Sequence, residues 1–221
     1  MTILYEDNHI IAVNKAVGEI VQGDKTGDEP LSEQLKRYIK AKYNKPGEVF
    51  LGVPHRIDRP TSGVVLFART SKALARLNEM FKSHELIRKT YWAVVQGVPS
   101  PEEGRLEHWL VRREAQNKTY VVSKGAKDGK FAALNYRVLK KGDRYSMVEV
   151  ELETGRHHQI RCQLSAIGCP IKGDLKYGAK RSNRDGGISL HARSVELVHP
   201  VSKERLKIEA PAPEGWIFGE G

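Results

Sequence analysis

The sequence predicts an α+β protein built on a mainly antiparallel sheet, and three observations lead to this class. Short strand-like segments outnumber helical ones along the 221 residues. The pairs Asp128-Gly129 and Gly142-Asp143 are typical of tight hairpin connections. Residues 148–152 alternate between apolar and acidic side chains, as a half-exposed antiparallel strand does. Together these features favour hairpin-connected strands over a doubly wound parallel sheet.

The first half of the chain predicts strands and helices in alternation. Two short apolar runs around a polar turn predict a strand, a turn and a strand. A polar stretch rich in Gly and Asp predicts a loop, and apolar residues at helical spacing predict an amphipathic helix. These elements are expected at residues 3–5, 10–13, 22–30 and 31–43.

A continuous apolar run at residues 64–68 predicts a buried strand. A helix is expected at residues 71–85, capped by Thr70 or Ser71. Residues 89–95 follow as a strand, with Lys89, Tyr91, Ala93 and Val95 on one face and Trp92 and Val94 on the other.

The second half predicts mostly strands. Four are expected at residues 105–111, 119–123, 132–139 and 145–152. A helix follows with Ile160, Leu164 and Ile167 as its apolar stripe, and strands at residues 189–198 and 206–209 close the fold. No internal repeat, low-complexity tract or linker interrupts the chain, so we expect a single domain over residues 1–221.

Composition limits the partners. The chain is 39% hydrophobic and 29% charged, which is typical of a globular protein. No apolar run approaches the roughly 20 residues of a membrane span, and the first residues do not resemble a signal peptide. A cytoplasmic protein without membrane contact is therefore expected. Cys162 and Cys169 do not fit a zinc or redox spacing and are expected to be reduced, packed thiols.

The net charge of +10 favours a polyanionic partner, above all nucleic acid. The basic residues are spread among predicted elements and form no long tail. A folded basic surface of this kind suits structured RNA.

Residues 55–63 (HRIDRPTSG) are the most informative segment. A carboxylate, Asp58, lies between two arginines in a stretch that proline and glycine keep out of a helix. In an extended run, Arg56 and Asp58 would point to one face and His55 and Ile57 to the other, and residues 61–63 would supply a tight turn. A carboxylate beside fixed positive charge stays ionised at neutral pH, which suits a nucleophile or a general base. A surface ion pair at a turn is the alternative interpretation.

This segment resembles the signature of the RluA family of RNA pseudouridine synthases, usually written HRLD followed by two residues and TSG, with Ile57 in place of the leucine. Other segments resemble the family's remaining motifs in the same order. They are residues 13–18 (VNKAVG), where Ala16 replaces a usual proline, 89–97 (KTYWAVVQG), 154–161 (TGRHHQIR), 173–178 (GDLKYG) and 190–192 (LHA). The resemblance extends over nearly the whole chain.

The resemblance implies a catalytic domain on a bent, mainly antiparallel mixed sheet with flanking helices and a central RNA-binding cleft. Many relatives carry an S4-type RNA-binding domain before it. Only 12 residues precede Val13, so that module is expected to be absent. The implied reaction isomerises uridine to pseudouridine in ribosomal or transfer RNA and requires no cofactor or metal.

The resemblance also implies the site residues. Asp58 would be the catalytic carboxylate, Arg161 the cation that pairs with it, and Tyr91 an active-site ring that stacks on uracil or assists proton transfer. Whether Asp58 attacks C1′, attacks C6 or removes a ribose proton stays open. Asp174 is expected to fix a turn.

RNA contacts are expected at four further residues. Arg56 would hold the flipped state of the target nucleotide by stacking or by gripping a phosphate. The other three are His55, Arg59 and Lys89. The pair His157-His158 is a poor chelate, because adjacent helix residues diverge by about 100°, and structural hydrogen bonds or phosphate contacts are expected instead. The protein is expected to be a monomer.

Two other functions remain open at this stage. A non-catalytic basic RNA-binding protein would explain the charge but not the combination of Asp58, Tyr91 and Arg161. A nucleic-acid glycosylase would also flip a base and use an aspartate, but it would release the base.

Overall fold

The computed structural model of the chain describes residues 1–83 and 86–218. Two compact units emerge: unit 1 comprises Met1–Arg88 and Ala192–Pro211, and unit 2 comprises Lys89–His191 and Ala212–Gly221. The single domain expected over residues 1–221 therefore stays a prediction. Within the described ranges, none of the helices has the length and apolar character needed to cross a membrane.

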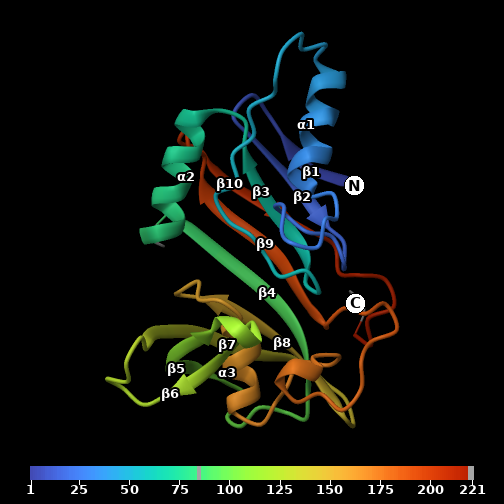
Figure 1. The fold of residues 1–221 in the computed structure, drawn as a ribbon. Helices are drawn as coiled ribbons and strands as arrows, with labels where there is room; N and C mark the ends of the chain where they lie inside the picture. Colours follow the sequence, from blue (N-terminus) through green and yellow to red (C-terminus); the bar gives the residue numbers. More distant parts are fainter. Residues whose placement is uncertain (84–85, 219–221) are drawn as a thin grey trace. The chain divides into compact units, whose positions relative to one another are not determined.

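Unit 1 is a sheet with two helices (Figure 1). Its strands follow the order β1-β2-β3-β9, and β10 pairs with β9. The pairing of β2 with β3 is antiparallel and runs from Ile10 opposite Ala68 to Lys15 opposite Gly63. The elements are β1 (Thr2–Glu6), β2 (Ile10–Lys15), α1 (Leu31–Lys42), β3 (Ser62–Ala68), α2 (Ser71–Ser83), most of β9 (Leu190–Val198) and β10 (Arg205–Glu209).

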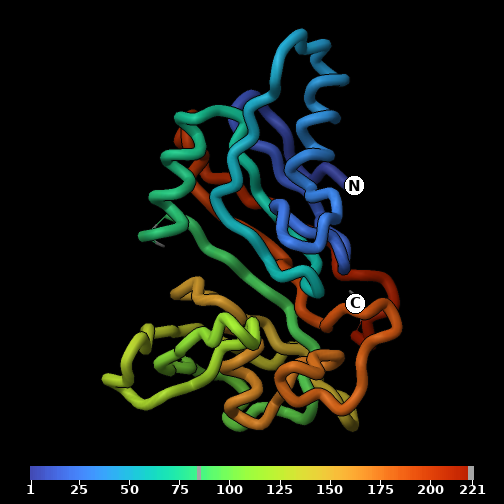
Figure 2. The backbone as a smooth tube through the Cα atoms, in the orientation of Figure 1, coloured from blue at the N-terminus to red at the C-terminus, as the bar shows by residue number. Residues whose placement is uncertain are grey.

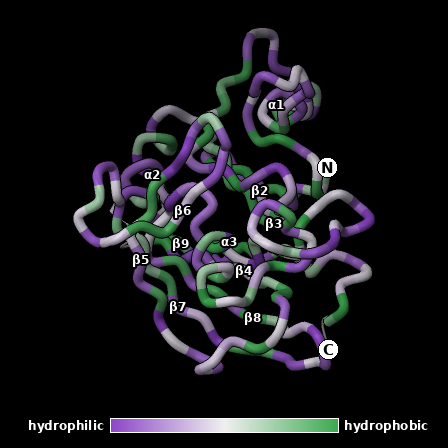
Figure 3. Tube along the Cα trace, turned by 60° about the horizontal axis from the view of Figure 1, so that its bottom comes forward, coloured by the Kyte–Doolittle hydropathy of each residue, from purple (hydrophilic) through white to green (hydrophobic). Residues whose placement is uncertain are grey.

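The two helices of unit 1 cover opposite faces of the sheet. Leu66 of β3 belongs to the same core cluster as Leu77 of α2. The next residue, Phe67, belongs to a second cluster with Leu35 of α1. Because neighbouring residues of a strand face opposite sides, β3 is buried on both faces. This explains the continuous apolar run of the sequence, which appears green along β3 in Figure 3.

Helix α2 begins where the sequence predicted. The hydroxyl oxygen of Thr70 accepts the backbone N–H of Ala73 at 3.1 Å, so Thr70, rather than Ser71, is the cap. The helix extends to Ser83. The two last residues of the predicted helix, 84 and 85, lie outside the described residues.

Unit 2 is a second antiparallel arrangement, in the strand order β4-β8-β7-β5-β6. All of its pairings in this order are antiparallel, which confirms the predicted α+β class. The elements are most of β4 (Ile87–Gln96), β5 (Glu103–Arg113), a short 3-10 helix η1 (Glu114–Gln116), β6 (Lys118–Val122), β7 (Lys130–Lys141), β8 (Tyr145–Leu152), α3 (Gln159–Ala166) and a second 3-10 helix η2 (Leu175–Tyr177).

The core of unit 2 lies between α3 and one face of its sheet. Ala93 and Val95 of β4 cluster with Ile160 and Leu164 of α3, and Tyr91 packs against the same cluster. The predicted face of β4 is thereby confirmed for these residues. Ile167, expected in the helical stripe, is instead the residue that ends α3 and packs at the edge of the core.

Candidate active site

The loop that carries Asp58 turns earlier than predicted. The backbone N–H of Thr61 donates to the carbonyl oxygen of Asp58 at 3.0 Å, which closes a turn through Arg59 and Pro60. The turn expected at residues 61–63 is wrong, because β3 already begins at Ser62. Figure 2 shows this loop at the end of the connection that leads from α1 to β3. Asp58 therefore lies directly before the turn, with its side chain half-buried.

Gly63 has a different role from the predicted one. It is a strand residue with a φ of +112°, and an added Cβ would lie 2.3 Å from the carbonyl oxygen of Ala192. Both the backbone conformation and the close approach of β9 exclude a side chain here. The glycine of the motif thus lets the two strands approach closely behind the turn.

The expected alternation of residues 55–58 is also wrong, because this segment is not a regular strand. The ring of His55 stacks on Phe81, with centroids 4.3 Å apart, and its Nε2 accepts the backbone N–H of Leu66 at 2.9 Å. Ile57, expected on the same face, packs against the α1 side of the sheet. These contacts give His55 a structural role in unit 1. Its predicted contact with RNA stays a prediction.

The residue that sequence reasoning missed in unit 1 is Lys15. Its side chain is fully buried, and its Nζ donates to the carbonyl oxygens of Ala16 at 2.9 Å and Arg59 at 3.0 Å. Burial lowers the pKa of Lys15 to about 8, whereas the nearby carboxylates of Glu19 and Asp58 act in the opposite direction. A buried cation thus holds the turn after Asp58 through the main chain.

The two arginines beside Asp58 are both exposed. Arg59 donates to the carboxylate of Asp28, which is also exposed, so its side chain is turned to an acid of the neighbouring loop. Arg56 has no ion pair with any residue that the structure describes. Of the two, Arg56 is the better placed to contact a phosphate or a base.

Strand β4 of unit 2 presents the predicted tyrosine and lysine. Tyr91 is half-buried against the core of unit 2. Lys89 is 7% exposed, and burial lowers the pKa of its ammonium to about 8. A buried lysine is a poor phosphate contact, so the structure does not favour the predicted RNA-binding role of Lys89, which stays a prediction.

Arg161 of α3 is buried and rigidly oriented within unit 2. Its Nε and Nη2 donate to the two carboxylate oxygens of Asp174 at 2.7 and 2.8 Å. The guanidinium also lies over the ring of Tyr177, 5.1 Å from the centroid. This bidentate pairing fixes the plane of the guanidinium. The predicted pairing of Arg161 with Asp58 would join the two units and stays a prediction.

Asp174 combines the expected role with one that was missed. Its carbonyl oxygen accepts the backbone N–H groups of Tyr177 and Ala179, both at 3.0 Å, so its main chain fixes a turn. Its carboxylate, buried to 1% exposure, holds Arg161. The two residues are 13 positions apart, and no spacing rule connects residues at that separation.

The neighbouring histidines make structural hydrogen bonds, as predicted. His158 has a left-handed backbone before α3, and its Nδ1 lies 3.0 Å from the hydroxyl of Tyr177. Burial, aided by the nearby charge of Arg161, lowers the pKa of His158 to about 2, so the ring is neutral. His157 lies 2.8 Å from the hydroxyl of Thr119 through its Nδ1.

The two cysteines and the potential metal ligands of the described residues form no further reactive site. Both cysteines are free and buried, which confirms the expected packed thiols. Burial raises the pKa of Cys162 to about 11, and burial also raises the pKa of the Cys169 thiol above its usual range. Within residues 1–83 and 86–218, no three His, Cys, Asp or Glu side chains come together as a metal site would require.

Each unit offers its own set of groups that could take part in chemistry. Unit 1 offers a carboxylate on a turn held by a buried ammonium, beside an exposed guanidinium. Unit 2 offers a half-buried phenol and a buried guanidinium of fixed orientation. Such groups suit proton transfer or nucleophilic attack at a polar substrate.

Comparison with known proteins agrees with the resemblance found in the sequence. A family model described as RNA pseudouridylate synthase matches residues 9–166. The ribosomal large subunit pseudouridine synthase D of Zymomonas mobilis is 33% identical over 97% of this chain and 70% of its own length. The tRNA pseudouridine synthase C of Pectobacterium carotovorum is 32% identical over 98% of this chain and 60% of its own length.

The fold agrees as well. The structure of human RNA pseudouridylate synthase domain containing 4 superposes with a TM-score of 0.81 and 25% identity, and it covers 96% of this chain and 89% of the human chain. A family model over most of the chain, relatives above 30% identity and this fold point the same way. The chain belongs to the RNA pseudouridylate synthase family, as its motifs predicted.

Proposed function

We propose that this protein converts uridine to pseudouridine in ribosomal or transfer RNA, with Asp58 as the catalytic carboxylate. The observation that carries the proposal is the support of the Asp58 turn by the buried Lys15, inside a segment that matches the family signature. A buried cation costs folding free energy unless it is compensated. A surface turn with an ordinary ion pair would not require one.

The reaction needs only groups that the chain supplies. The bond between ribose C1′ and uracil N1 breaks, the base turns, and a bond forms between C1′ and C5. The proton on C5 is lost and N1 gains one, so the step is balanced without a redox partner. Asp58 attacks C1′, attacks C6 or removes a ribose proton, and Tyr91 stacks on the base or assists the proton transfer at C5.

Arg161 and Arg56 would serve this chemistry in different ways. Arg161 keeps the catalytic carboxylate ionised and oriented when the two meet, because a guanidinium stabilises the charged form. Arg56, exposed on the same loop as Asp58, holds the space of the extracted nucleotide or its phosphate. Extraction of a stacked base costs a few kcal/mol, and such a contact offsets part of that cost.

The substrate classes come from the relatives. One of them is named for the large ribosomal subunit and another for tRNA. A net charge of +10 supports binding to either polyanion. A non-catalytic RNA-binding protein is the second candidate, and the same charge is the observation that favours it.

A tritium-release assay separates these candidates. Unmodified transcripts of tRNAs and of large-subunit rRNA fragments are labelled at C5 of uridine and incubated with the protein. Isomerisation at C5 releases tritium without free uracil, a glycosylase releases free uracil, and a binding protein releases neither.

The decisive variant is Asp58→Asn, with Asp28→Asn as the matched control from the neighbouring loop. We expect Asp58→Asn to lower turnover at least about 100-fold with RNA affinity nearly unchanged, because phosphate contacts do not depend on this carboxylate. Asp28→Asn removes only an exposed ion pair and should keep turnover within about threefold, since such pairs contribute little. Residual turnover of Asp58→Asn within tenfold of the native protein refutes the assignment of Asp58.

A further inference from the structure

A cavity of about 420 Å³ lies within unit 2, at the carboxyl end of β4, where Gln96 and Gly97 line it. It is formed by the ends of β4 and β8 and by the segments around residues 170–173 and 179–181. Gln96 and Tyr91 are five residues apart on β4. At about 3.4 Å per residue, the cavity begins about 17 Å along the strand from the predicted catalytic tyrosine.

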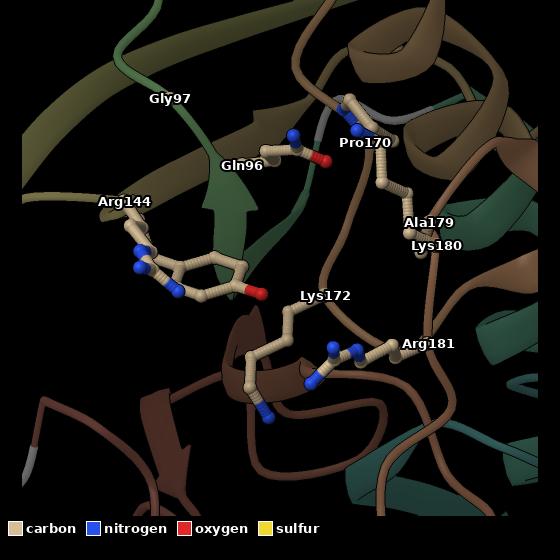
Figure 4. Close-up of a pocket in the computed structure, with 10 residues that line it drawn as sticks. Gln96, Gly97, Arg144, Pro170, Lys172, Ala179, Lys180 and Arg181 are labelled. Atoms are coloured by element: carbon tan, nitrogen blue, oxygen red, sulfur yellow. The ribbon is translucent and has the colours of Figure 1, made fainter.

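Positive charge dominates the wall of this cavity. Four of its ten lining residues are cations and none is an acid. Figure 4 shows the charged ends of Lys172 and Arg181 next to each other and the guanidinium of Arg144 at another side of the same space. The fourth cation is Lys180.

None of these four cations is paired with a carboxylate among the residues that the structure describes. Elsewhere in unit 2, Arg105 and Arg137 are paired with glutamates. Unpaired like charges that converge on a concave surface repel one another and focus a positive potential into it. An anion in the cavity would relieve that repulsion.

Part of the cavity is rigidly built. Lys172 donates through Nζ to the side-chain oxygen of Asn183 at 2.7 Å, and Asn183 donates in turn to the hydroxyl of Ser189 at 3.1 Å. Gly173 follows with a φ of +88°, and an added Cβ would lie 2.7 Å from the Asn183 side chain. The backbone N–H of Lys172 donates to Val94 at 2.8 Å. This lysine is therefore aimed before any ligand arrives.

The cavity also offers surfaces for a base. Tyr145 lines it, half-buried, directly opposite Gln96 in the register of β8 and β4. An aromatic ring stacks on any nucleobase, and an amide can donate to and accept from its edge. A ring, an amide and unpaired cations together match the base and the phosphate of one nucleotide.

We propose that this cavity binds one nucleotide of the RNA strand, with its phosphate against the four cations and its base against Tyr145. The proposal rests on the proposed function, because it takes RNA as the ligand. At about 3.4 Å per stacked nucleotide, 17 Å corresponds to about five nucleotides. The site thus contacts RNA outside the modified uridine and sets how far the substrate must extend.

The test removes two exposed cations of the cavity that have no carboxylate partner in the described part of the chain, in Arg144→Gln/Arg181→Gln. The matched control, Lys72→Gln/Lys82→Gln, removes the same charge from the exposed surface of α2. Binding to a tRNA transcript is measured over a range of salt concentrations. We expect the cavity variant to raise Kd about tenfold and to lower the slope of log K against log salt by about 1, because one phosphate contact is lost. The control should change Kd less than about threefold.

Two further arms sharpen the result. Tyr145→Leu should weaken binding about tenfold, whereas Tyr145→Phe should not, because stacking needs only the ring. With RNAs trimmed in steps around the modified uridine, the defect of the cavity variant should vanish once the RNA no longer reaches the cavity. Equal losses for the cavity variant and the control, or a defect that persists on the shortest RNA, would overturn the proposal.

A free nucleotide is the alternative source of the same chemistry. Uridine monophosphate at about 1 mM should not displace RNA, because one nucleotide lacks the other contacts of the strand. Displacement at this concentration that is abolished in Arg144→Gln/Arg181→Gln would assign the cavity to a free nucleotide instead. Failure of the proposed function is seen separately, as absence of tritium release by the native protein, whereas the binding arms do not depend on turnover.

Discussion

The Asp58 loop of unit 1 and the Arg161 helix of unit 2 are stabilised by opposite means. In unit 1, the buried Lys15 donates to two main-chain carbonyls and has no carboxylate within ion-pair distance among the described residues. In unit 2, the side chain of Arg161 is held by a bidentate contact with the carboxylate of Asp174. Lys15 thus stabilises the main chain around it, whereas Arg161 is itself held in place by another side chain. Buried cations in one protein therefore do not have a common role.

The largest expected effect concerns Arg161. If Arg161 orients Asp58, Arg161→Met should lower turnover nearly as much as Asp58→Ala, at least about 100-fold. The double variant should be little worse than either single one, because residues that act as a unit are strongly non-additive. Single-turnover rates on the active transcript measure this.

Lysine at position 161 should restore part of the rate, since it keeps the charge but not the fork. Arg156→Met is the control, because Arg156 lies in the same motif, is exposed, and its side chain donates to the carbonyl oxygen of Phe131. Full activity of Arg161→Met would show that Arg161 is not the functional residue of unit 2.

The second effect is on folding and separates the two kinds of support. Asp174→Asn leaves the buried Arg161 without its acid, and we expect a loss of about 3–5 kcal/mol in the free energy of unfolding. Lys15→Met replaces a buried cation with an apolar side chain of similar shape. It should cost less than about 2 kcal/mol while turnover falls, because the turn after Asp58 loses its hydrogen bond from Nζ to the carbonyl oxygen of Arg59.

Urea unfolding curves measure both values, and Asp143→Asn provides an exposed control in unit 2. If Lys15→Met destabilises the protein as much as Asp174→Asn, Lys15 is mainly a folding residue and the contrast between the two units fails.

The third effect depends on pH and concerns Lys15, whereas the Arg161 guanidinium stays charged. The ordinary pKa of lysine is 10.5, and burial lowers that of Lys15 to about 8. Between these values the unfolded chain binds more protons than the folded one, so stability rises with pH through this window. One such group contributes up to about 1.4 kcal/mol per pH unit. Lys89, which also has a pKa of about 8, acts in the same direction.

Between about pH 8 and 10.5, the native protein should therefore gain stability relative to Lys15→Met, because the variant lacks this titrating group. Turnover should move the other way, since deprotonated Lys15 no longer places a positive charge near Asp58. Urea curves and kcat/KM recorded across this range test both signs. A pH profile of Lys15→Met parallel to the native one would mean that Lys15 does not titrate there.

The smallest expected effect concerns the exposed guanidinium of Arg56, in contrast to the buried guanidinium of Arg161. Arg56→Ala should slow a structured stem-loop several-fold more than an unstructured strand with the same uridine, because only the stem-loop must be unstacked, at a cost of a few kcal/mol. Rates on the two RNAs measure this. Loss of Arg161 should affect both RNAs alike. Equal losses for Arg56→Ala on both would indicate a phosphate contact instead of a role in base extraction.

The sequence predicted the elements where one local signal dominates. The apolar run of β3 and the alternation of β8 each follow from the faces that these strands bury. The Thr70 cap follows from a hydroxyl placed before an amphipathic run. The candidate residues Asp58, Tyr91 and Arg161 rest on family motifs, since none of them has a distinctive local spacing, and their catalytic roles stay predictions.

The parts that were missed depend on distant contacts. Lys15 reads as an ordinary polar end of a strand, and only its hydrogen bond to Arg59, 44 residues away, reveals its burial. The turn at Arg59 and Pro60 was misplaced because the close approach of Ala192 to Gly63 has no sequence signal. The fork of Asp174 on Arg161 links a helix to a separate turn. No local rule contains these pairings.

The two buried thiols have a practical consequence. Cys162 and Cys169 are buried, and their pKa values are raised by that burial. Maleimides and iodoacetamides attack exposed thiolates, so they should leave the native chain unlabelled at neutral pH. A single cysteine introduced at an exposed lysine such as Lys127 would then be the unique attachment point for a fluorophore. The protein can therefore be labelled for dye-based measurements of RNA docking without prior removal of its own cysteines.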